Sequence, residues 1–362
     1  MLSMKRLIAI FLIIAGISAS AVAVDLRYVD AEDLTVVNRA QERDTTFARL
    51  NAANYPELPA KVAEYSNHST GLAVAFRTDS RNIGAKWTTS SICAGANRTL
   101  LSVAGLDLYI LRDGKWIAAG VGKPTDPASS SATLVASMDG EMHDCLLYLP
   151  LWAKIETLEI GVDDGAVIEP LPNPFGPRVV FMGSSITHGA SAGRPGLTYP
   201  SRIQRATGWE IPNLGYSGLC KLEPFYARIV ADTDADAFVF DGFSNPKAEE
   251  IDARLQEFVD IIRAAKPGVP LIFIQTEVRE TGNFDLKKRD FEARKRAASR
   301  AGMKRLIDAG YRDIYFVDPG MPLADDHDDN IDGIHPTDAG FQRISNHLLP
   351  VLRSILFSYG IE

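Results

Sequence analysis

The sequence is poor in cysteine, has no excess of basic residues and lacks long apolar segments beyond its N-terminus. Three cysteines among 362 residues are too few for a disulfide-stapled scaffold or a cysteine-rich metal cluster. The 38 lysines and arginines are outnumbered by 46 aspartates and glutamates, which argues against a dedicated nucleic-acid binder, because phosphates call for a basic face. With 46% hydrophobic and 23% charged residues, the chain is a folded, mildly acidic protein long enough for two domains.

The first 23 residues predict an export signal rather than a part of the fold. Lys5 and Arg6 precede an apolar run over residues 7–17, and small residues lead from there to Ala23. A basic start, a short apolar core and an A-x-A exit are typical of a secretory signal peptide. The run is much shorter than the roughly 20 residues of a membrane span, so a permanent anchor is the weaker alternative. We expect cleavage after Ala23 and a secreted or periplasmic mature protein without a membrane span.

Export would permit a disulfide between cysteines. Cys93 and Cys145 both lie in the N-terminal half and could pair, whereas Cys220 lies far along the chain. The alternative is that all three are buried thiols that act as small hydrophobic side chains. Both alternatives stay open, because the geometry that a bridge requires is not readable from the sequence.

Residues 24–169 have the pattern of an all-β domain. Apolar runs such as 72–76 and 108–111 have the length of strands. Asp-Gly pairs at 113–114 and 139–140 lie between such runs, and Asp-Gly is a strong hairpin signal because both positions tolerate positive φ. Many short strands with frequent turns predict a jelly-roll-like sandwich.

The pattern changes near residue 170. Four prolines in residues 170–177 cannot continue a helix or a central strand, so this segment is predicted to be a stiff linker. From 178 to 362, apolar runs alternate with amphipathic helices, such as residues 251–266 with apolar side chains on one face. This alternation predicts an α/β domain with a parallel sheet that is covered by helices on both faces.

Polar residues follow the predicted strands of this second domain, where ligands bind in open α/β sheets. In chain order these residues are Ser185, Gly218, Asn245, Asp332 and His335. They are the groups that acyl transfer from an ester needs. Ser185 would be the nucleophile, His335 its base, and Asp332 would orient the imidazole. The backbone N–H groups of Ser185 and Gly218, with the Asn245 amide, would donate hydrogen bonds to the oxyanion.

These residues resemble the sequence blocks of the SGNH hydrolases, also called the GDSL family of esterases and lipases. The block 183–187 is similar to that family's G-D-S-I-T signature, with Ser184 where aspartate is commonest. The glycine, the asparagine and the Asp-x-x-His pair named above correspond to the remaining blocks. The resemblance covers roughly residues 178–357 and implies a flavodoxin-like sheet with strand order 2-1-3-4-5. Residues 105–109, Gly-Leu-Asp-Leu-Tyr, also resemble the signature of a β-domain that precedes the catalytic domain in one subgroup.

Together with the predicted export signal, the resemblance implies a secreted or periplasmic serine esterase that hydrolyses short acyl esters. The expected substrate is an acylated small molecule or polysaccharide, with O-acetyl groups on carbohydrates foremost. One alternative is a lipase or lysophospholipase, which the absence of an evident apolar lid or interfacial segment disfavours. Another is a glycan-binding protein with an idle hydrolase domain. The oligomeric state is not indicated by the sequence.

Other polar residues are assigned smaller roles. His188 and Arg194 lie near Ser185 in the sequence and are expected to contact substrate. The acidic run 325–329 is expected to be a solvated loop, and no metal or other cofactor is expected, because serine acyl transfer needs none. Residues 287–305 carry nine basic residues, but apolar positions among them suit a helix with one buried face, so we expect no nucleic-acid partner.

Overall fold

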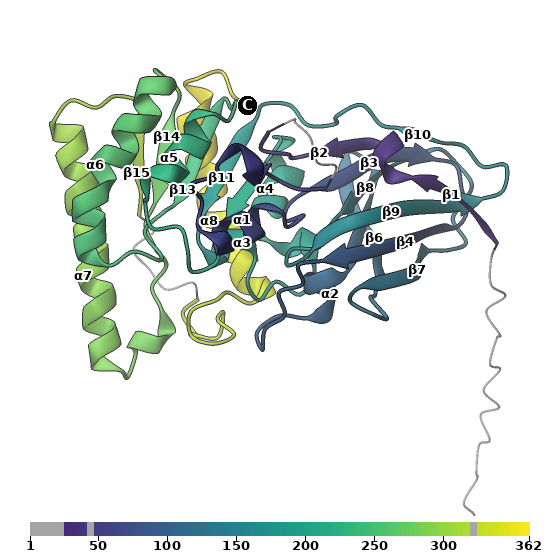
Figure 1. Ribbon diagram of the computed structural model, residues 1–362, viewed down its shortest axis with the longest axis horizontal. Coiled ribbons are helices and arrows are strands. Elements are labelled where there is room, and N and C mark those ends of the chain that lie inside the picture. The colour runs from purple at the N-terminus through teal and green to yellow at the C-terminus, as the bar shows by residue number, and fades with distance from the viewer. Residues whose placement is uncertain (1–24, 42–46, 319–323) are drawn as a thin grey trace, which may run out of the picture.

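The computed structural model describes residues 25–41, 47–318 and 324–362. Figure 1 shows antiparallel sheets at one end of the molecule and a parallel sheet with its helices at the other. The predicted signal peptide, residues 1–23, lies outside the described residues. Within the described ranges, no helix combines the length and the apolar character needed to cross a membrane.

The N-terminal part consists of two antiparallel sheets, as its short apolar runs predict. One sheet contains, in spatial order, β1 (Leu26–Asp30), β9 (Lys154–Asp163), β4 (Ile83–Ser90) and β7 (Ser129–Val135). The other contains β10 (Ile168–Pro170), β3 (Ala73–Thr78), β8 (His143–Tyr148), β5 (Leu106–Arg112) and β6 (Lys115–Gly122), and β2 (Thr35–Val37) also pairs with β3. Side chains from both sheets, among them Phe76, Trp87 and Leu147, form one shared apolar core.

The two predicted Asp-Gly turns have different outcomes. Asp113 has φ 52° and Gly114 has φ 71°, and they join β5 and β6 in the expected hairpin. The pair at 139–140 does not form a hairpin, because the strands on either side belong to different sheets: β7 pairs with β4, and β8 with β3 and β5. This turn therefore connects the two sheets.

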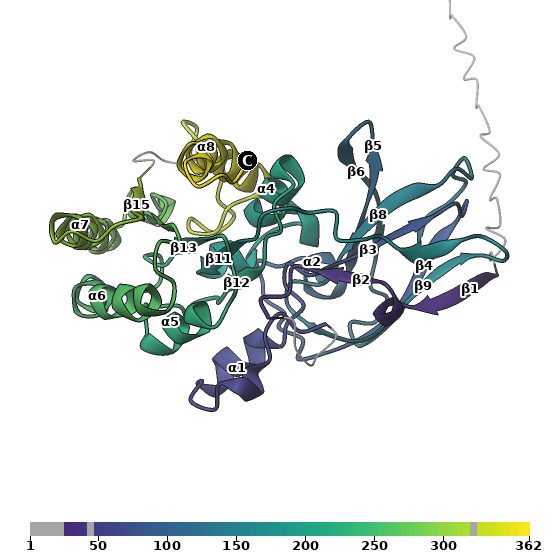
Figure 2. The ribbon, with the colours of Figure 1, turned by 90° about the horizontal axis from the view of Figure 1, so that it is seen from above.

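The C-terminal part is built on a five-stranded parallel sheet, in agreement with the predicted alternation. Its strands lie in the order β12 (Asn213–Gly215), β11 (Val179–Gly183), β13 (Ala237–Asp241), β14 (Leu271–Ile274) and β15 (Ile314–Val317). The helices are α3 (Ser185–His188), α4 (Tyr199–Thr207), α5 (Pro224–Ala231), α6 (Ala248–Ala265), α7 (Leu286–Asp308) and α8 (Asp338–Phe357). Figure 2 shows α4 and α8 on one face of the sheet and α5 and α6 on the other, with α7 beside α6.

The cysteines do not pair in the structure. All three are free thiols; Cys145 and Cys220 are buried and Cys93 is half-buried. The structure therefore supports the thiol alternative over a bond between Cys93 and Cys145.

The proline-rich segment 170–177 is anchored to the N-terminal part. Pro170 ends β10, where it pairs with Phe76 of β3 at the edge of its sheet, a position that tolerates a missing N–H. Leu171 and Phe175 are buried against a small apolar cluster that includes Tyr109. The segment is therefore held along its length rather than hanging free.

The two parts share an apolar core. Helices α1 (Ala60–Ser66) and α2 (Leu100–Ala104) belong to the N-terminal part. Their buried side chains Val62 and Val103, together with Trp152, lie in the same core cluster as the strands of the parallel sheet. Short 3₁₀ helices, η1 (Ala31–Asp33), η2 (Ala52–Asn54), η3 (Pro195–Leu197) and η4 (Glu280–Gly282), lie in the connecting segments. Because burial of apolar area is the main stabilising contribution, this shared core fixes the parts against each other.

A buried ion pair crosses the same contact. Leu106 and Leu108 of β5 point into the sandwich core, so the alternation along the strand turns Asp107 and Tyr109 the other way, toward the C-terminal part. Asp107, which is fully buried, is paired with Arg194 and accepts a hydrogen bond from the N–H of Gly196 at 2.8 Å. The Tyr109 hydroxyl accepts a second Arg194 N–H at 3.0 Å. A Cβ on Gly196 would lie 2.6 Å from the Tyr109 ring, so this close approach requires glycine.

We expect Arg194→Ala to lower the free energy of unfolding by about 3 kcal/mol, because it leaves the Asp107 carboxylate buried without its partner. Chemical denaturation measures the difference. Arg77→Ala is the matched control, since the Arg77–Asp144 pair at 3.0 Å is partly exposed and such pairs contribute less than about 1 kcal/mol. Equal losses in the free energy of unfolding would show that the buried pair stabilises the protein no more than the exposed one.

Candidate active site

Ser185 lies on the first turn after β11, an interior strand of the parallel sheet. Ser184 caps helix α3, and its hydroxyl accepts a hydrogen bond from the N–H of Ile186 at 3.0 Å. Ser185 is the first residue of the helix and is 8% exposed. The N–H groups of a first helical turn have no intrahelical acceptor, so the Ser185 N–H is not used within helix α3. The helix stops at Gly189, where φ is 101°.

The structure brings Ser185, His335 and Asp332 together. The Ser185 hydroxyl oxygen lies 2.9 Å from His335 Nε2, and His335 Nδ1 lies 2.8 Å from Asp332 Oδ2. The second Asp332 oxygen accepts the backbone N–H of His335, also at 2.8 Å. Burial opposes the charge on Asp332, but the hydrogen bonds from the His335 backbone and ring outweigh it and lower the pKa of the carboxyl. The carboxylate therefore stays ionised beside the imidazole.

The loop that carries His335 is shaped by local contacts. Gly333 has φ 79°, which allows the turn between Asp332 and His335. The carbonyl of His335 accepts the N–H of Ile331 at 2.8 Å, which closes the loop on itself. Thr337 then caps helix α8 by accepting the Gly340 N–H at 3.1 Å. The imidazole is thus held at the entry of a long helix.

Gly218 and Asn245 follow the two strands that flank β11. Since β12 and β13 lie on either side of β11, the loops after them border the end of the strand that carries Ser185. Gly218 has φ 73°, a backbone conformation that favours glycine. The side-chain amide of Asn245 points to the same loop, with Nδ2 at 3.5 Å from the carbonyl oxygen of Tyr216. The structure therefore places both predicted oxyanion donors on the loops beside Ser185.

Two basic side chains, Arg279 and Lys295, hold the loop that carries Asn245. The carbonyl of Ser244 accepts hydrogen bonds from Arg279 at 2.7 Å and from Lys295 at 3.0 Å. Both cations also pair with Glu292. Burial and the nearby Arg279 lower the pKa of Lys295 to about 8. These contacts fix the backbone from which the Asn245 amide projects.

A buried carboxylate that the sequence analysis missed connects the turn at Ser184 with the loop that carries Ser244 and Asn245. Asp241, the last residue of β13, accepts hydrogen bonds from the hydroxyls of Ser184, Thr187 (3.1 Å) and Ser244 (2.7 Å). Burial raises the pKa of Asp241, and the hydrogen bond from Ser184 is the largest of the contacts that oppose the shift. The only signal in the sequence is an aspartate at the end of an apolar strand.

His188 and Arg194, the two predicted substrate contacts, are engaged with residues of the N-terminal part. His188 is fully buried, and its Nε2 lies 2.8 Å from the carbonyl oxygen of Leu151. Arg194 is engaged with Asp107 and Tyr109 across the contact between the two parts. Both side chains point toward the N-terminal part, and their contact with substrate stays a prediction.

His188 belongs to a stack of three side chains, here called the interdomain stack: Arg98, Trp152 and His188. The rings of Trp152 and His188 lie 3.7 Å apart with an angle of 7° between them. The guanidinium of Arg98 lies 3.4 Å from the centre of the Trp152 ring. Burial, together with the positive charge of Arg49, lowers the pKa of His188 well below its usual range, so the imidazole stacks as a neutral ring.

One further residue reaches the Asp332–His335 pair. Asn97 lies between β4 and α2, in the N-terminal part, and its side-chain amide donates a hydrogen bond to Asp332 Oδ2 at 3.0 Å. The sequence analysis missed it because a single asparagine in a polar loop has no motif and lies 235 positions from its partner.

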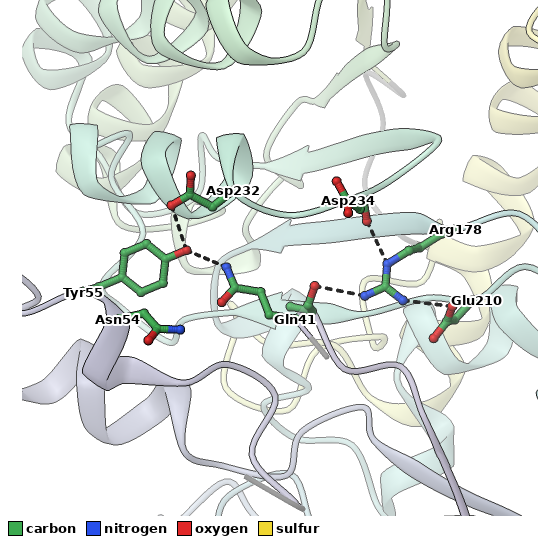
Figure 3. Close-up of a pocket in the computed structure, with 8 residues that line it drawn as sticks. Gln41, Asn54, Tyr55, Arg178, Glu210, Asp232 and Asp234 are labelled. Atoms are coloured by element: carbon green, nitrogen blue, oxygen red, sulfur yellow. Dashed lines mark hydrogen bonds and ion pairs between the residues drawn. The ribbon is translucent and has the colours of Figure 1, made fainter. Parts of the chain in front are cut away.

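The cavity in Figure 3 lies at the amino ends of the parallel strands, opposite the end that carries Ser185. It has a volume of about 540 Å³ and its polar lining includes Tyr55, Arg178, Glu210, Asp232 and Asp234. Arg178 directly precedes β11, so this cavity borders the amino end of the strand, whereas Ser185 follows its carboxyl end. In the part of the chain that the structure describes, no group of three or more histidine, cysteine, aspartate or glutamate side chains is placed to hold a metal ion.

Comparison with known proteins identifies both parts of the chain. Residues 177–353 match the family model of GDSL-like lipases and acylhydrolases, and residues 26–168 match the model of the N-terminus of SGNH-hydrolase-type esterases. No curated protein matches the chain.

Several solved structures resemble the chain over nearly its whole length. A GDSL-like lipase from Bacteroides ovatus ATCC 8483 is 41% identical, with a TM-score of 0.90, over 92% of this chain and 98% of its own. The salicylyl-acyltransferase SsfX3 from a tetracycline biosynthetic pathway is 20% identical (TM-score 0.68; 93% and 98% covered). An acetyl xylan esterase from the rumen bacterium Butyrivibrio proteoclasticus is 14% identical (TM-score 0.59; 92% and 99% covered). The last two likenesses concern the fold alone.

We expect Ser184→Asp to destabilise the protein by about 3 kcal/mol, because it places a second carboxylate against the buried Asp241. Thermal unfolding measures the loss. The two carboxyls would then share a proton with a raised pKa, so the loss should shrink as the pH falls and grow as it rises above the unfolded value near 4.

The double variant Ser184→Asp with Asp241→Asn is the control. It restores a single carboxylate with a neutral partner and should recover most of the stability. A Ser184→Asp variant as stable as the parent protein at pH 8 would contradict the role assigned to the Asp241 network.

Proposed function

The chain belongs to the family of GDSL-like lipases and acylhydrolases and is a carboxylic ester hydrolase, and on that premise we propose that it is an exported serine esterase that removes short acyl groups, above all O-acetyl, from carbohydrates. The observation that carries the proposal is the continuous chain of contacts from the Ser185 hydroxyl through His335 to Asp332, at 2.9 Å and 2.8 Å. Such a chain is what activation of a serine hydroxyl requires.

The proposed organisation follows the sequence pattern. Residues 1–23 are the signal peptide, 24–169 a jelly-roll-like accessory domain, 170–177 the linker and 178–362 the catalytic domain. In this proposal the parallel sheet has the flavodoxin-like order 2-1-3-4-5, in which the first strand carries the nucleophile between the second and third.

In the proposed mechanism, His335 Nε2 takes the proton of Ser185 while the serine oxygen attacks the ester carbonyl. Asp332 keeps the other imidazole proton on Nδ1 and stabilises the imidazolium that forms. His335 then donates its proton to the leaving sugar oxygen. A water molecule, deprotonated by His335, hydrolyses the acyl-enzyme and releases the acid.

The charge on the tetrahedral intermediate would be stabilised by three donors. These are the N–H groups of Ser185 and Gly218 and the side-chain amide of Asn245. The Asn245 amide makes only a long contact of 3.5 Å with the Tyr216 carbonyl, a weak bond that is readily exchanged for one to an oxyanion. Removal of one such donor typically costs on the order of 10²–10³ in turnover.

The substrate class is supported by the character of the site. Asp332 and His335 are partly exposed, with 37% and 18% of their side chains accessible, and the polar amide of Asn97 lies beside them. Such polar surroundings suit an acylated sugar better than a long lipid chain. An acetyl xylan esterase is among the proteins with a similar fold.

Chain-length preference tests the proposed substrate against the lipase alternative. We expect kcat/KM on nitrophenyl acetate to exceed that on nitrophenyl octanoate at least tenfold, because the side chains of Asn97 and Asp332 beside His335 are polar and give a long acyl chain no apolar contact. The Ser185→Ala variant, assayed in parallel, corrects for background hydrolysis. A preference for octanoate would overturn the deacetylase proposal in favour of a lipase. Acetate release from a panel of acetylated plant glycans then identifies the natural ester.

Substitutions at the three proposed catalytic residues test the mechanism. Ser185→Ala and His335→Ala should each lower kcat by on the order of 10⁴ or more, with little change in stability. Asp332→Ala should cost less, because Asp332 only orients the base. Retention of parental activity in folded Ser185→Ala protein would show that another residue is the nucleophile.

A further inference from the structure

The N-terminal part reaches the proposed catalytic groups through Asn97. Its side-chain nitrogen lies 3.0 Å from Asp332 Oδ2 and 3.3 Å from His335 Nδ1. The Asp332 oxygen that it contacts is the one that faces the imidazole at 2.8 Å. An amide nitrogen is only a donor, so it directs an N–H at the carboxylate, and His335 Nδ1 approaches the same oxygen.

The segment that presents Asn97 is held on both sides. Before it, the N–H of Cys93 donates to the carbonyl of Trp152 at 2.8 Å. After it, Arg98 lies on the Trp152 ring and donates to the Cys93 carbonyl at 2.7 Å, and the hydroxyl of Thr99 donates to the carbonyl of Gly193 at 2.7 Å. The position of Asn97 is therefore set by contacts with both parts of the molecule.

The interdomain stack relates this segment to the nucleophile. Arg98, which follows Asn97, stacks on one face of the Trp152 ring, and His188 stacks on the other. His188 is the last residue of helix α3, which begins with Ser185. Movement of the segment relative to α3 would break this stack. The stack thus fixes the distance between Asn97, which contacts Asp332, and Ser185, which contacts His335.

We propose that Asn97 is a positioning residue of the hydrolase, through which the N-terminal part orients the Asp332–His335 pair. This inference rests on the function proposed above. The amide donates to the charged carboxylate of Asp332 and holds it where its Oδ2 accepts the hydrogen bond from Nδ1–H of His335, so that Nε2 is left unprotonated and directed at Ser185. A hydrogen bond to a charged group is stronger than one between neutral groups, and here it replaces water at a partly exposed carboxylate.

Among the described residues, the His335 ring has three side-chain partners within hydrogen-bond distance. Ser185 on α3 and Asn97 on the 91–99 segment face its ring as neutral groups, and Asp332 on its own loop is the charged partner. The cation next to Asn97, Arg98, is engaged with Cys93 and Trp152. A new charge at position 97 would therefore act directly on the Asp332–His335 pair.

The decisive variant is Asn97→Asp, because aspartate has the shape of asparagine but offers no amide donor. We expect kcat to fall about 100-fold with little change in KM. The acidic limb of the kcat/KM profile should move to higher pH by about one unit, because a second negative charge favours the protonated imidazole. Asn97→Ala removes the donor without adding charge and should lower kcat about tenfold with a smaller shift of that limb.

Asn346→Asp is the matched control, since it adds the same charge on the exposed side of α8 and should leave kcat and the pH profile unchanged. Thermal unfolding of all variants establishes that each is folded. If Asn97→Asp keeps the parental kcat and pH profile while Ser185→Ala is inactive, the role of Asn97 is refuted and the proposed esterase function stands. If Ser185→Ala is itself active, the proposed mechanism fails first.

Discussion

The stacking of Trp152 between Arg98 and His188 is the contact on which the arrangement of the site depends. His188 ends the short helix that begins with Ser185, and Arg98 adjoins the residue that contacts Asp332. Aromatic and cation–π stacking restrict both distance and orientation, so this one contact relates the nucleophile to a segment of the other part. The neutral state of His188, caused by its burial, makes the stack compatible with the charge of Arg98.

Three aspartates near the site illustrate how burial decides the role of one side-chain type. Asp332 is partly exposed and stays ionised, because its hydrogen bonds outweigh desolvation. Asp241 and Asp107 are buried, and burial raises the pKa of each. Asp241 is surrounded by hydroxyl donors and connects loops of the same sheet, whereas Asp107 faces a full charge on Arg194 and connects the two parts. Of the three, only the partly exposed Asp332 contacts the imidazole of His335.

The N-terminal part is therefore packed into the structure that holds the proposed site and is not a separate module. It shares an apolar core with the parallel sheet, contributes the buried partner of Arg194 and brings Asn97 to the Asp332–His335 pair. The GDSL-like lipase from Bacteroides ovatus resembles this chain over nearly its whole length, so that relative has the same two-part layout. In such a layout, a change in the packing of the two parts alters the geometry of the site.

The local pattern of the chain determined the elements and most of the proposed site. The apolar face of α6 consists of the side chains that helical spacing predicts, and the Asp-x-x-His spacing places Asp332 within reach of His335 because both are on one loop. The same reasoning did not find the contacts of His188 and Arg194 with the N-terminal part, since proximity in the sequence does not say toward which neighbour a side chain points. Asn97, Asp107 and Asp241 escaped it as well. Their partners lie 57 to 235 positions away, and contacts at that separation leave no periodicity or spacing in the sequence. Only the packing of the two parts and the order of the strands decided which of these polar groups meet.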